Sequence, residues 1–466
     1  MMTQGLNHNP PMPGVARLPI VVPVAVLSFF YASVLEYSLP LYFGALGEAA
    51  EARGGFFPAD IWSKLVKYQV TPWVVGPILA GLLARRYGER IVWSGALLGK
   101  MIVPLLLAIH PEPNMIKLLA LWQGFTGALM WIAGISLIQM VAPEKKGLSN
   151  GLMMASIGVG SLLGPLGGRV LIYRQELSPL VSSGSWGEMW SRLFSFTPMT
   201  MTPNVSDFHL IFWILTATTL VCGVLVGLWG QHPGRFEQEV PAGWSRTLHD
   251  IGRLARTPKF WALVIALCLL GGPVFQASNQ FLPFRAEDLG LKSGARDDGW
   301  IWLQLLKTLM WIPGGLAVGR LAGRRAPGIA AVIMLASFSL AALGIGMSGT
   351  AFQLFVYVAI FEFMRQFMRW SHAGYLSEHL PGGLRTTAIG FAITFSGLGS
   401  AIYAWAADAL WDPATQSSQP IYAAALLGGV GCVGLFVFDR LRPIREPESV
   451  SSVSGEPVVA ASPAGE

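Results

Sequence analysis

Charge is scarce in this 466-residue chain, in which Asp, Glu, Lys and Arg together make up 12% of the residues. Soluble domains carry about 25%. Apolar residues reach 53%, and runs of about 20 of them recur along the whole length. These two features exclude a soluble globular protein. An outer-membrane barrel is excluded as well, because its strands alternate in polarity about every two residues and these runs do not.

Cysteine is scarce too. The three cysteines, Cys222, Cys268 and Cys432, all fall inside apolar runs, so we expect small core residues and no disulfide framework. No acidic or His-rich motif has metal-ligand spacing and no Ser–His–Asp set stands out, so we expect neither an enzyme nor a cofactor or metal. The net charge of +6 is spread over short loops, which argues against nucleic-acid binding.

The apolar runs predict an all-α membrane protein with twelve transmembrane helices. The expected spans cover residues of about 18–45, 61–84, 91–110, 115–142, 148–173, 208–230, 259–283, 300–320, 328–348, 352–377, 386–411 and 420–440.

The even number of spans places both termini on one side of the membrane. Loops on that side carry many more Lys and Arg residues than the opposite loops, so the positive-inside rule predicts cytoplasmic termini. We expect a monomeric, integral multi-pass protein of a bacterial inner membrane, with the lipid bilayer around it. The predicted domains are an N-terminal tail over 1–17 without a signal peptide, a six-helix bundle over 18–230, a linker over 231–258, a second bundle over 259–441 and a disordered tail over 442–466.

The two predicted bundles repeat each other in sequence. Spans five and eleven match as Gly158-Val159-Gly160-Ser161 and Gly397-Leu398-Gly399-Ser400. In span two, nine residues recur 238 positions later: Asp60, Trp62, Leu65, Trp73, Gly76, Gly81, Leu83, Ala84 and Arg86 match Asp298, Trp300, Leu303, Trp311, Gly314, Gly319, Leu321, Ala322 and Arg324. The pattern predicts a duplicated six-helix unit, and two such halves can rock about a site near the membrane midplane.

A glycine and proline motif in span five carries a resemblance to a known family. Gly160, Gly164, Pro165 and Gly168 form Gly-x3-Gly-Pro-x2-Gly, which is similar to the motif of the drug:proton antiporter branch of the major facilitator superfamily. Glycines four residues apart leave one helix face bare, so that another helix can approach closely, and proline bends the helix.

The loop between spans two and three resembles the same superfamily's Gly-x-Leu-Ala-Asp-Arg-x-Gly-Arg-Arg signature. It contains Gly81, Arg85, Arg86, Gly88 and Arg90, but Arg85 stands where the family has Asp. In span four, Gln123-Gly124 fits the end of an Arg-x-x-Gln-Gly motif associated with proton coupling, with Ala120 in place of the Arg. The resemblance implies two pseudo-symmetric six-helix bundles, alternating access and a cavity lined by spans one, four, seven and ten.

Intramembrane charges are the candidate site residues, because a charge at the bilayer centre costs about 2.5–3.5 kcal/mol and needs a partner or water. In span ten, Glu362, Arg365, Arg369 and His372 fall within an arc of roughly 80° on one helix face. Two guanidiniums against one carboxylate suit an anionic solute. The alternative is an internal Glu362–Arg365 pair, with Arg369 tying helices together.

Glu36 is the corresponding candidate in span one. Its repeat mate is Asn279 in span seven, flanked by Gln276 and Gln280. Removal from water penalises the charged form of a carboxylate, which suits a proton carrier, and family members often place an acidic coupling residue in span one. The competing interpretation pairs Glu36 with Arg365 or Arg369 across the cavity.

Five other intramembrane charges are given an expected position at most, and no definite functional role. Lys307 in span eight is expected to face the same cavity. Lys67 is expected to extend towards the interface, and Arg169 and Asp408 to be solvated there, with a gate pair as the alternative. Lys100, in a peripheral span, has no explanation from the sequence.

The resulting functional hypothesis is a secondary transporter that moves a small organic solute, anionic or amphiphilic, by alternating access with proton coupling. The span-five motif favours export slightly. The alternatives are a proton symporter that imports a solute and a transport-inactive membrane receptor or assembly protein on the same fold.

Overall fold

The computed structural model describes residues 18–58, 60–109, 112–140, 146–194, 199, 201–229, 252, 256, 261, 264–265, 271–314, 317, 327–379, 385–411 and 417–440. The predicted tails over 1–17 and 442–466 and nearly all of the linker over 231–258 lie outside these residues.

Helices fall on every one of the predicted spans. The N-terminal half contains α1 (Leu18–Glu51), α2 (Ile61–Val70), the 3-10 turn η1 (Thr71–Val74), α3 (Gly76–Tyr87), α4 (Glu89–Lys100), α5 (Ile102–Ile109), α6 (Pro113–Met140), α7 (Lys146–Ile172), α8 (Arg174–Ser182), α9 (Trp186–Phe194) and α10 (Val205–Trp229). The C-terminal half contains α13 (Gly272–Asp288), β1 (Lys292–Ser293), β2 (Arg296–Asp297), α14 (Trp300–Leu309), α16 (Pro327–Met347), α17 (Ala351–His379), α18 (Arg385–Leu410) and α19 (Ser418–Arg440).

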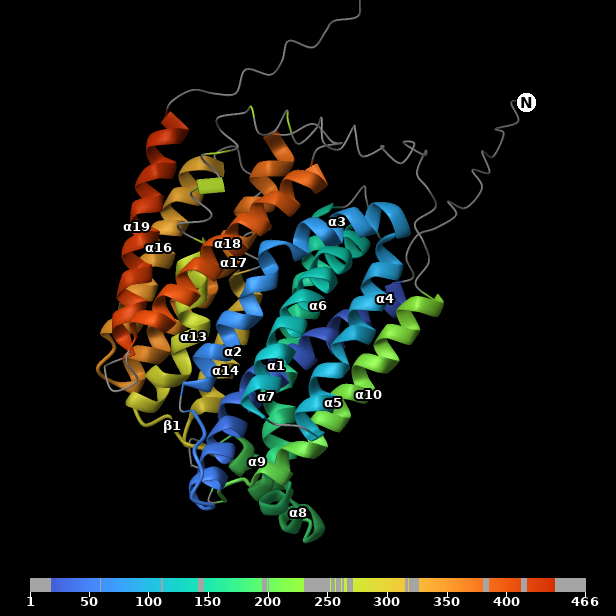
Figure 1. The fold of residues 1–466 in the computed structure, drawn as a ribbon, viewed down its shortest axis with the longest axis vertical. Helices are drawn as coiled ribbons and strands as arrows, with labels where there is room; N and C mark the ends of the chain where they lie inside the picture. The colour runs from blue at the N-terminus through green and yellow to red at the C-terminus, as the bar shows by residue number, and fades with distance from the viewer. Residues whose placement is uncertain are drawn as a thin grey trace, which may run out of the picture.

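The two halves stand side by side, with the N-terminal half drawn blue to green and the C-terminal half yellow to red (Figure 1). The short helices α8 and α9 and the two-residue strands β1 and β2 lie together at the bottom of the view, and we call this the hairpin end. The larger cluster of buried apolar side chains runs through both halves.

Spans two and three are broken, which the prediction of continuous helices did not anticipate. Span two passes from α2 through η1 to α3, with Pro72 and Pro77 at the breaks. Span three breaks at Met101, just before Pro104. Proline lacks the N–H that an α-helix needs in its interior, so each break falls at or just before a proline.

On length and apolarity alone, four described helices are long enough to cross a membrane, and the α7–α8 pair, bent by 83°, would make a fifth. The qualifying segments are Val21–Glu51, Glu89–Ile109, Pro113–Gly134 and Val205–Leu228. The helices α2 and α14 are 10 residues long each, which is too short to cross a membrane alone.

Helices α1 and α7 pack along each other, and the span-five glycines of α7 lie at this contact. A Cβ atom at Gly160 would collide with the main-chain oxygen of Val26, and one at Gly164 would collide with Ser33. At Gly168 it would come within 2.7 Å of the Tyr37 ring. The motif is therefore a groove for α1, which is the close approach that the glycine spacing predicts.

The glycines of the loop between spans two and three behave differently. Gly88 has φ +87° at the junction of α3 and α4, a conformation that other residues rarely adopt. A Cβ atom at Gly81 would meet nothing within 4 Å. Arg90 is half-buried, and the side chains of Arg85 and Arg86 lie outside the described part of the chain.

We expect Gly160→Ala to destabilise the protein by about 1–3 kcal/mol, because the added methyl group overpacks the α1–α7 contact. Gly81→Ala is the matched control, since it adds the same atom to a helix in open space and is expected to be neutral or stabilising by about 0.5–1 kcal/mol. Thermal unfolding of the detergent-solubilised protein measures both. Equal melting temperatures for the two variants would contradict the claim that Gly160 is needed for the close contact between α1 and α7.

Candidate functional site

An ion pair between Glu36 and Lys307 joins the two halves inside the bundles. The Lys307 ammonium donates to Oε1 of Glu36, from α14 to α1. The Lys307 side chain is 2% exposed, whereas the Glu36 side chain is 34% exposed. The pair joins the two halves, and only its Glu36 member is partly exposed. The carboxylate can thus exchange protons while its partner stays sealed.

This pairing differs from the predicted partner of Glu36. The competing interpretation paired it with an arginine of span ten, but the ion-pair partner of Arg365 is Glu362 on the same helix, with N–O distances of 2.9 and 3.0 Å. Side-chain positions of Arg369 and His372 lie outside the described residues, although α17 includes both.

The Glu362–Arg365 pair is enclosed on all sides that the structure describes. Trp311 donates its indole N–H to Oε2 of Glu362 at 2.8 Å. The Arg365 guanidinium lies 3.8 Å from the centre of the Phe275 ring, and both charged side chains are buried. In this conformation Glu362 neutralises Arg365, which is the arrangement of a structural clamp. Removing one partner of such a pair typically costs about 3–5 kcal/mol, since it leaves the other charge buried and unpaired.

The side-chain amides of α13 are only partly hydrogen-bonded. Gln280 donates from Nε2 to Oγ of Ser63 at 2.7 Å, across the two halves. Nε2 of Gln276, Oδ1 of Asn279 and Nε2 of Gln304 on α14 are buried without a hydrogen-bond partner among the described residues, and so is Oε1 of Gln280. Buried polar atoms nearly always have a partner, so these amides are candidates for contacts with water or a solute.

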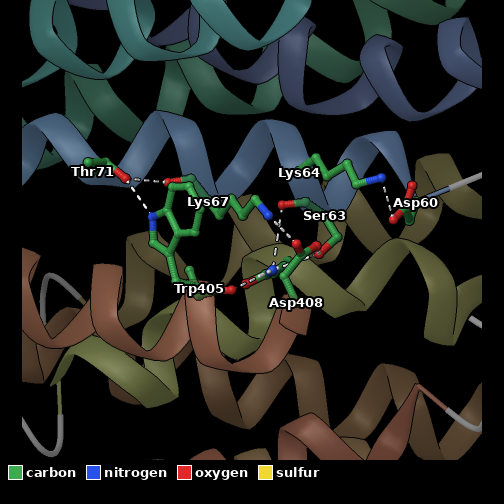
Figure 2. A network of polar contacts seen from close by, with 9 residues as sticks. Asp60, Ser63, Lys64, Lys67, Thr71, Trp405 and Asp408 are labelled. Carbon is green, nitrogen blue, oxygen red and sulfur yellow. Dashed lines mark hydrogen bonds and ion pairs between the residues drawn. The ribbon is translucent and has the colours of Figure 1, made fainter. Parts of the chain in front are cut away.

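A second cross-half ion pair links Lys67 on α2 to Asp408 on α18 (Figure 2). Ser63 donates to Oδ1 of Asp408 at 2.8 Å, and the Lys67 ammonium lies 4.5 Å from the centre of the Trp405 ring. The expectation that Lys67 extends to the interface and Asp408 is solvated there was wrong. Both side chains turn inward because each finds an opposite charge in the other half.

Asp297 forms a third connection, at the hairpin end. The Tyr37 hydroxyl donates to Oδ2 of Asp297 at 2.6 Å, and the Asp297 amide donates to the Tyr173 hydroxyl at 3.1 Å. Oδ1 of Asp297 also accepts from the amides of Gly299 and Ile301, so it caps α14, the helix that carries Lys307. Sequence reasoning missed this site, because Asp297 lies outside the predicted spans and neutral tyrosines were not candidates.

Arg169 is buried beside this connection. It is 1% exposed and donates from Nη1 to the main-chain oxygen of Leu193 in α9 at 3.4 Å. The expected solvation of Arg169 at the interface was therefore wrong. The described polar contacts between halves hold α1 and α2 against α13, α14 and α18, and they tie Tyr37 and Tyr173 to Asp297 at the hairpin end.

Two helical halves thus meet through buried charge pairs, with unpartnered amides beside them. Comparisons with known proteins give the family. The Major Facilitator Superfamily profile matches residues 65–404, well over half of the chain. The chain therefore belongs to this superfamily: it is an integral multi-pass membrane protein and not an enzyme.

The fold comparison agrees. A crystal structure of the nucleoside transporter NupG aligns with a TM-score of 0.62 and 13% identity, over 90% of this chain and 99% of that chain. The predicted all-helical fold is confirmed by this likeness.

Curated relatives match over shorter segments. MFS-type transporter ppzB of Metarhizium rileyi is 31% identical over 100 residues, 21% of each chain. Tetracycline resistance protein, class C, of Escherichia coli is 32% identical over 107 residues, which are 23% of this chain and 27% of that protein. The matched segments thus span about a fifth to a quarter of these relatives.

Proposed function

We propose that this protein couples solute transport to protons through the Glu36–Lys307 pair. The observation that carries the proposal is the asymmetry of the pair, in which a partly exposed carboxylate neutralises a sealed ammonium on the opposite half. Protonation of Glu36 cancels the attraction and leaves Lys307 unpaired, so that contact between the halves depends on the proton. A solute that interacts with either member of the pair is then linked to proton binding.

The proposed direction is export of a small organic solute, anionic or amphiphilic. Support comes from the span-five motif, which resembles that of drug:proton antiporters, and from the local similarity to a tetracycline resistance protein. In an exporter the solute and the proton compete: a hydrogen-bond donor or cationic group of the solute takes the Glu36 carboxylate only when that carboxylate is unprotonated. The unpartnered amides of Gln276, Asn279 and Gln304 would hold the remainder of the solute.

The pair also favours a second candidate, proton symport into the cell. Protonating Glu36 frees the Lys307 ammonium, and an anionic group can then replace the carboxylate. Proton and anion would be bound together and cross together. The two candidates therefore differ in solute and in direction: a cationic solute would move against the proton, and an anionic solute would move with it.

We further propose that the protein is a monomer in a bacterial inner membrane, with the hairpin end outside and both termini in the cytoplasm. The excess of Lys and Arg in the loops on the side of the termini supports this orientation. In that orientation, the contacts through Lys67, Asp297 and Gln280 close the route to the outside.

Reconstituted protein with an internal pH dye tests the function. The probes are ethidium, tetracycline and benzoate, which represent a cationic, a zwitterionic and an anionic solute. We expect solute-dependent proton movement, opposite to the solute for antiport and with it for symport. Binding of a probe without any flux would instead indicate a receptor, and flux indifferent to a pH gradient would overturn the coupling.

A further inference from the structure

Lys100 lacks the carboxylate partner that most buried cations of the described bundles have; Arg169 lacks one too, but it donates to the main-chain oxygen of Leu193. Lys67, Lys307 and Arg365 each have a carboxylate partner. Lys100, on α4, is only 3% exposed, yet no carboxylate of the described residues lies within ion-pair distance of its ammonium. A buried ammonium without an opposite charge is costly, and this one lies inside the N-terminal half and not at its surface.

The surroundings of Lys100 stabilise a positive charge without neutralising it. Its Nζ lies 4.8 Å from the centre of the Tyr31 ring, in a cation–π contact between α4 and α1. The Tyr31 hydroxyl lies 3.1 Å from Oε1 of Gln123 on α6 and 3.3 Å from the main-chain oxygen of Lys100, and donates to them. Such a ring contact is weaker than an ion pair, so the charge is held in place but remains unbalanced.

Gln123 supplies a second hydrogen-bond donor group beside Lys100, and its side chain is partly accessible. Its amide oxygen is taken by Tyr31, so the amide N–H groups point elsewhere and have no partner within the part of the chain that the structure describes. The side chain is half-buried, so part of it stays accessible. Both side chains contact Tyr31, and an ammonium and an amide N–H pair without acceptors among the described residues are donors that suit an oxyanion.

We propose that Lys100 and Gln123 bind an anionic oxygen group, a carboxylate or a phosphate, inside the N-terminal half. The group is either part of the transported solute or a free inorganic anion. The first source rests on the proposed function and restricts its solutes to those that carry an acidic group; the second does not depend on transport.

The test is the melting temperature of the purified protein in detergent, titrated with sodium acetate or sodium phosphate. We expect wild type to gain about 3 °C or more at saturation, because an anion that binds only the folded state stabilises it. Lys100→Met should lose this gain and melt no lower than wild type without anions, since the side chain keeps its length and loses an unbalanced charge. The matched control is Lys117→Met, which should respond like wild type. It removes an exposed lysine whose ammonium donates to Oδ1 of Asn114, at 3.3 Å.

Gln123→Glu is the second variant. It places a carboxylate of the same shape beside Tyr31, so it should remove the response to acetate and phosphate and raise the anion-free melting temperature. Equal responses of wild type and Lys100→Met would overturn the proposal, as would an unchanged response of Gln123→Glu.

Flux measurements separate the two sources. If acetate or phosphate also competes with solute uptake into proteoliposomes, the site binds the solute's own acidic group. If these anions raise the melting temperature without slowing flux, the site holds a free anion. Absence of any flux would count against the proposed function and leave the thermal result intact.

Discussion

Replacing Glu36 with glutamine is expected to reduce proton-driven solute flux to the level of empty liposomes, while solute exchange stays within about tenfold of wild type. Glutamine keeps the shape of the side chain and can still accept from Lys307, but it cannot release a proton. Exchange needs only solute binding and movement of the halves, so it should persist for an anionic solute such as benzoate, which binds the Lys307 ammonium and does not need the Glu36 carboxylate. Both fluxes are measured in proteoliposomes, with and without an imposed pH gradient.

Two further variants make this result specific. Glu51→Gln removes an exposed carboxylate from the same helix and should leave both fluxes unchanged. Glu36→Gln alone leaves the 2% exposed Lys307 ammonium unpaired, so we expect a loss of stability that Glu36→Gln/Lys307→Met recovers without restoring coupling. Unchanged proton-driven uptake in Glu36→Gln would exclude this residue as the proton carrier.

The fold could be predicted from the sequence because a bilayer leaves the chain few options. Backbone groups in lipid must be satisfied within the segment, so every long apolar run becomes helical. The positions of Pro72 and Pro104 held the information about the helix breaks, but apolarity alone passed over them. The span-five glycines predicted a close helix contact, although the sequence did not reveal that α1 is the helix they accommodate.

The sequence predicted which residues belong to the candidate site, but it did not predict which of them pair with each other. An intramembrane charge stands out in any sequence, which is how Glu36, Lys307 and Arg365 were found. Their partners depend on how helices from opposite halves are rotated and translated, since Glu36 and Lys307 are 271 residues apart. The short interval between Glu362 and Arg365 was the exception, because one helical turn fixes their proximity.

Exchanging the charges of Lys67 and Asp408 tests whether their pair holds the hairpin end closed. Lys67→Asp alone places two carboxylates together, and Asp408→Lys alone places two ammoniums together, in a site where both native side chains are almost sealed. We expect each single variant to lower the transport rate at least about tenfold, a change of about 1.4 kcal/mol or more in the closure of this end. The double variant should recover most of that loss, because opposite charges again face each other between α2 and α18.

The neighbouring Lys64–Asp60 pair is the control, since it lies on the same segment one turn away (Figure 2). It joins residues of one half only and is 31% and 25% exposed, so Lys64→Asp should change transport little. Recovery by Lys67→Asp/Asp408→Lys is expected to be partial, because the introduced carboxylate cannot stack on Trp405 and the introduced ammonium cannot accept from Ser63. If the double variant is no better than the worse single one, attraction between these two charges does not close the hairpin end, and the contacts of Asp297 with Tyr37 and Tyr173 would have to do so.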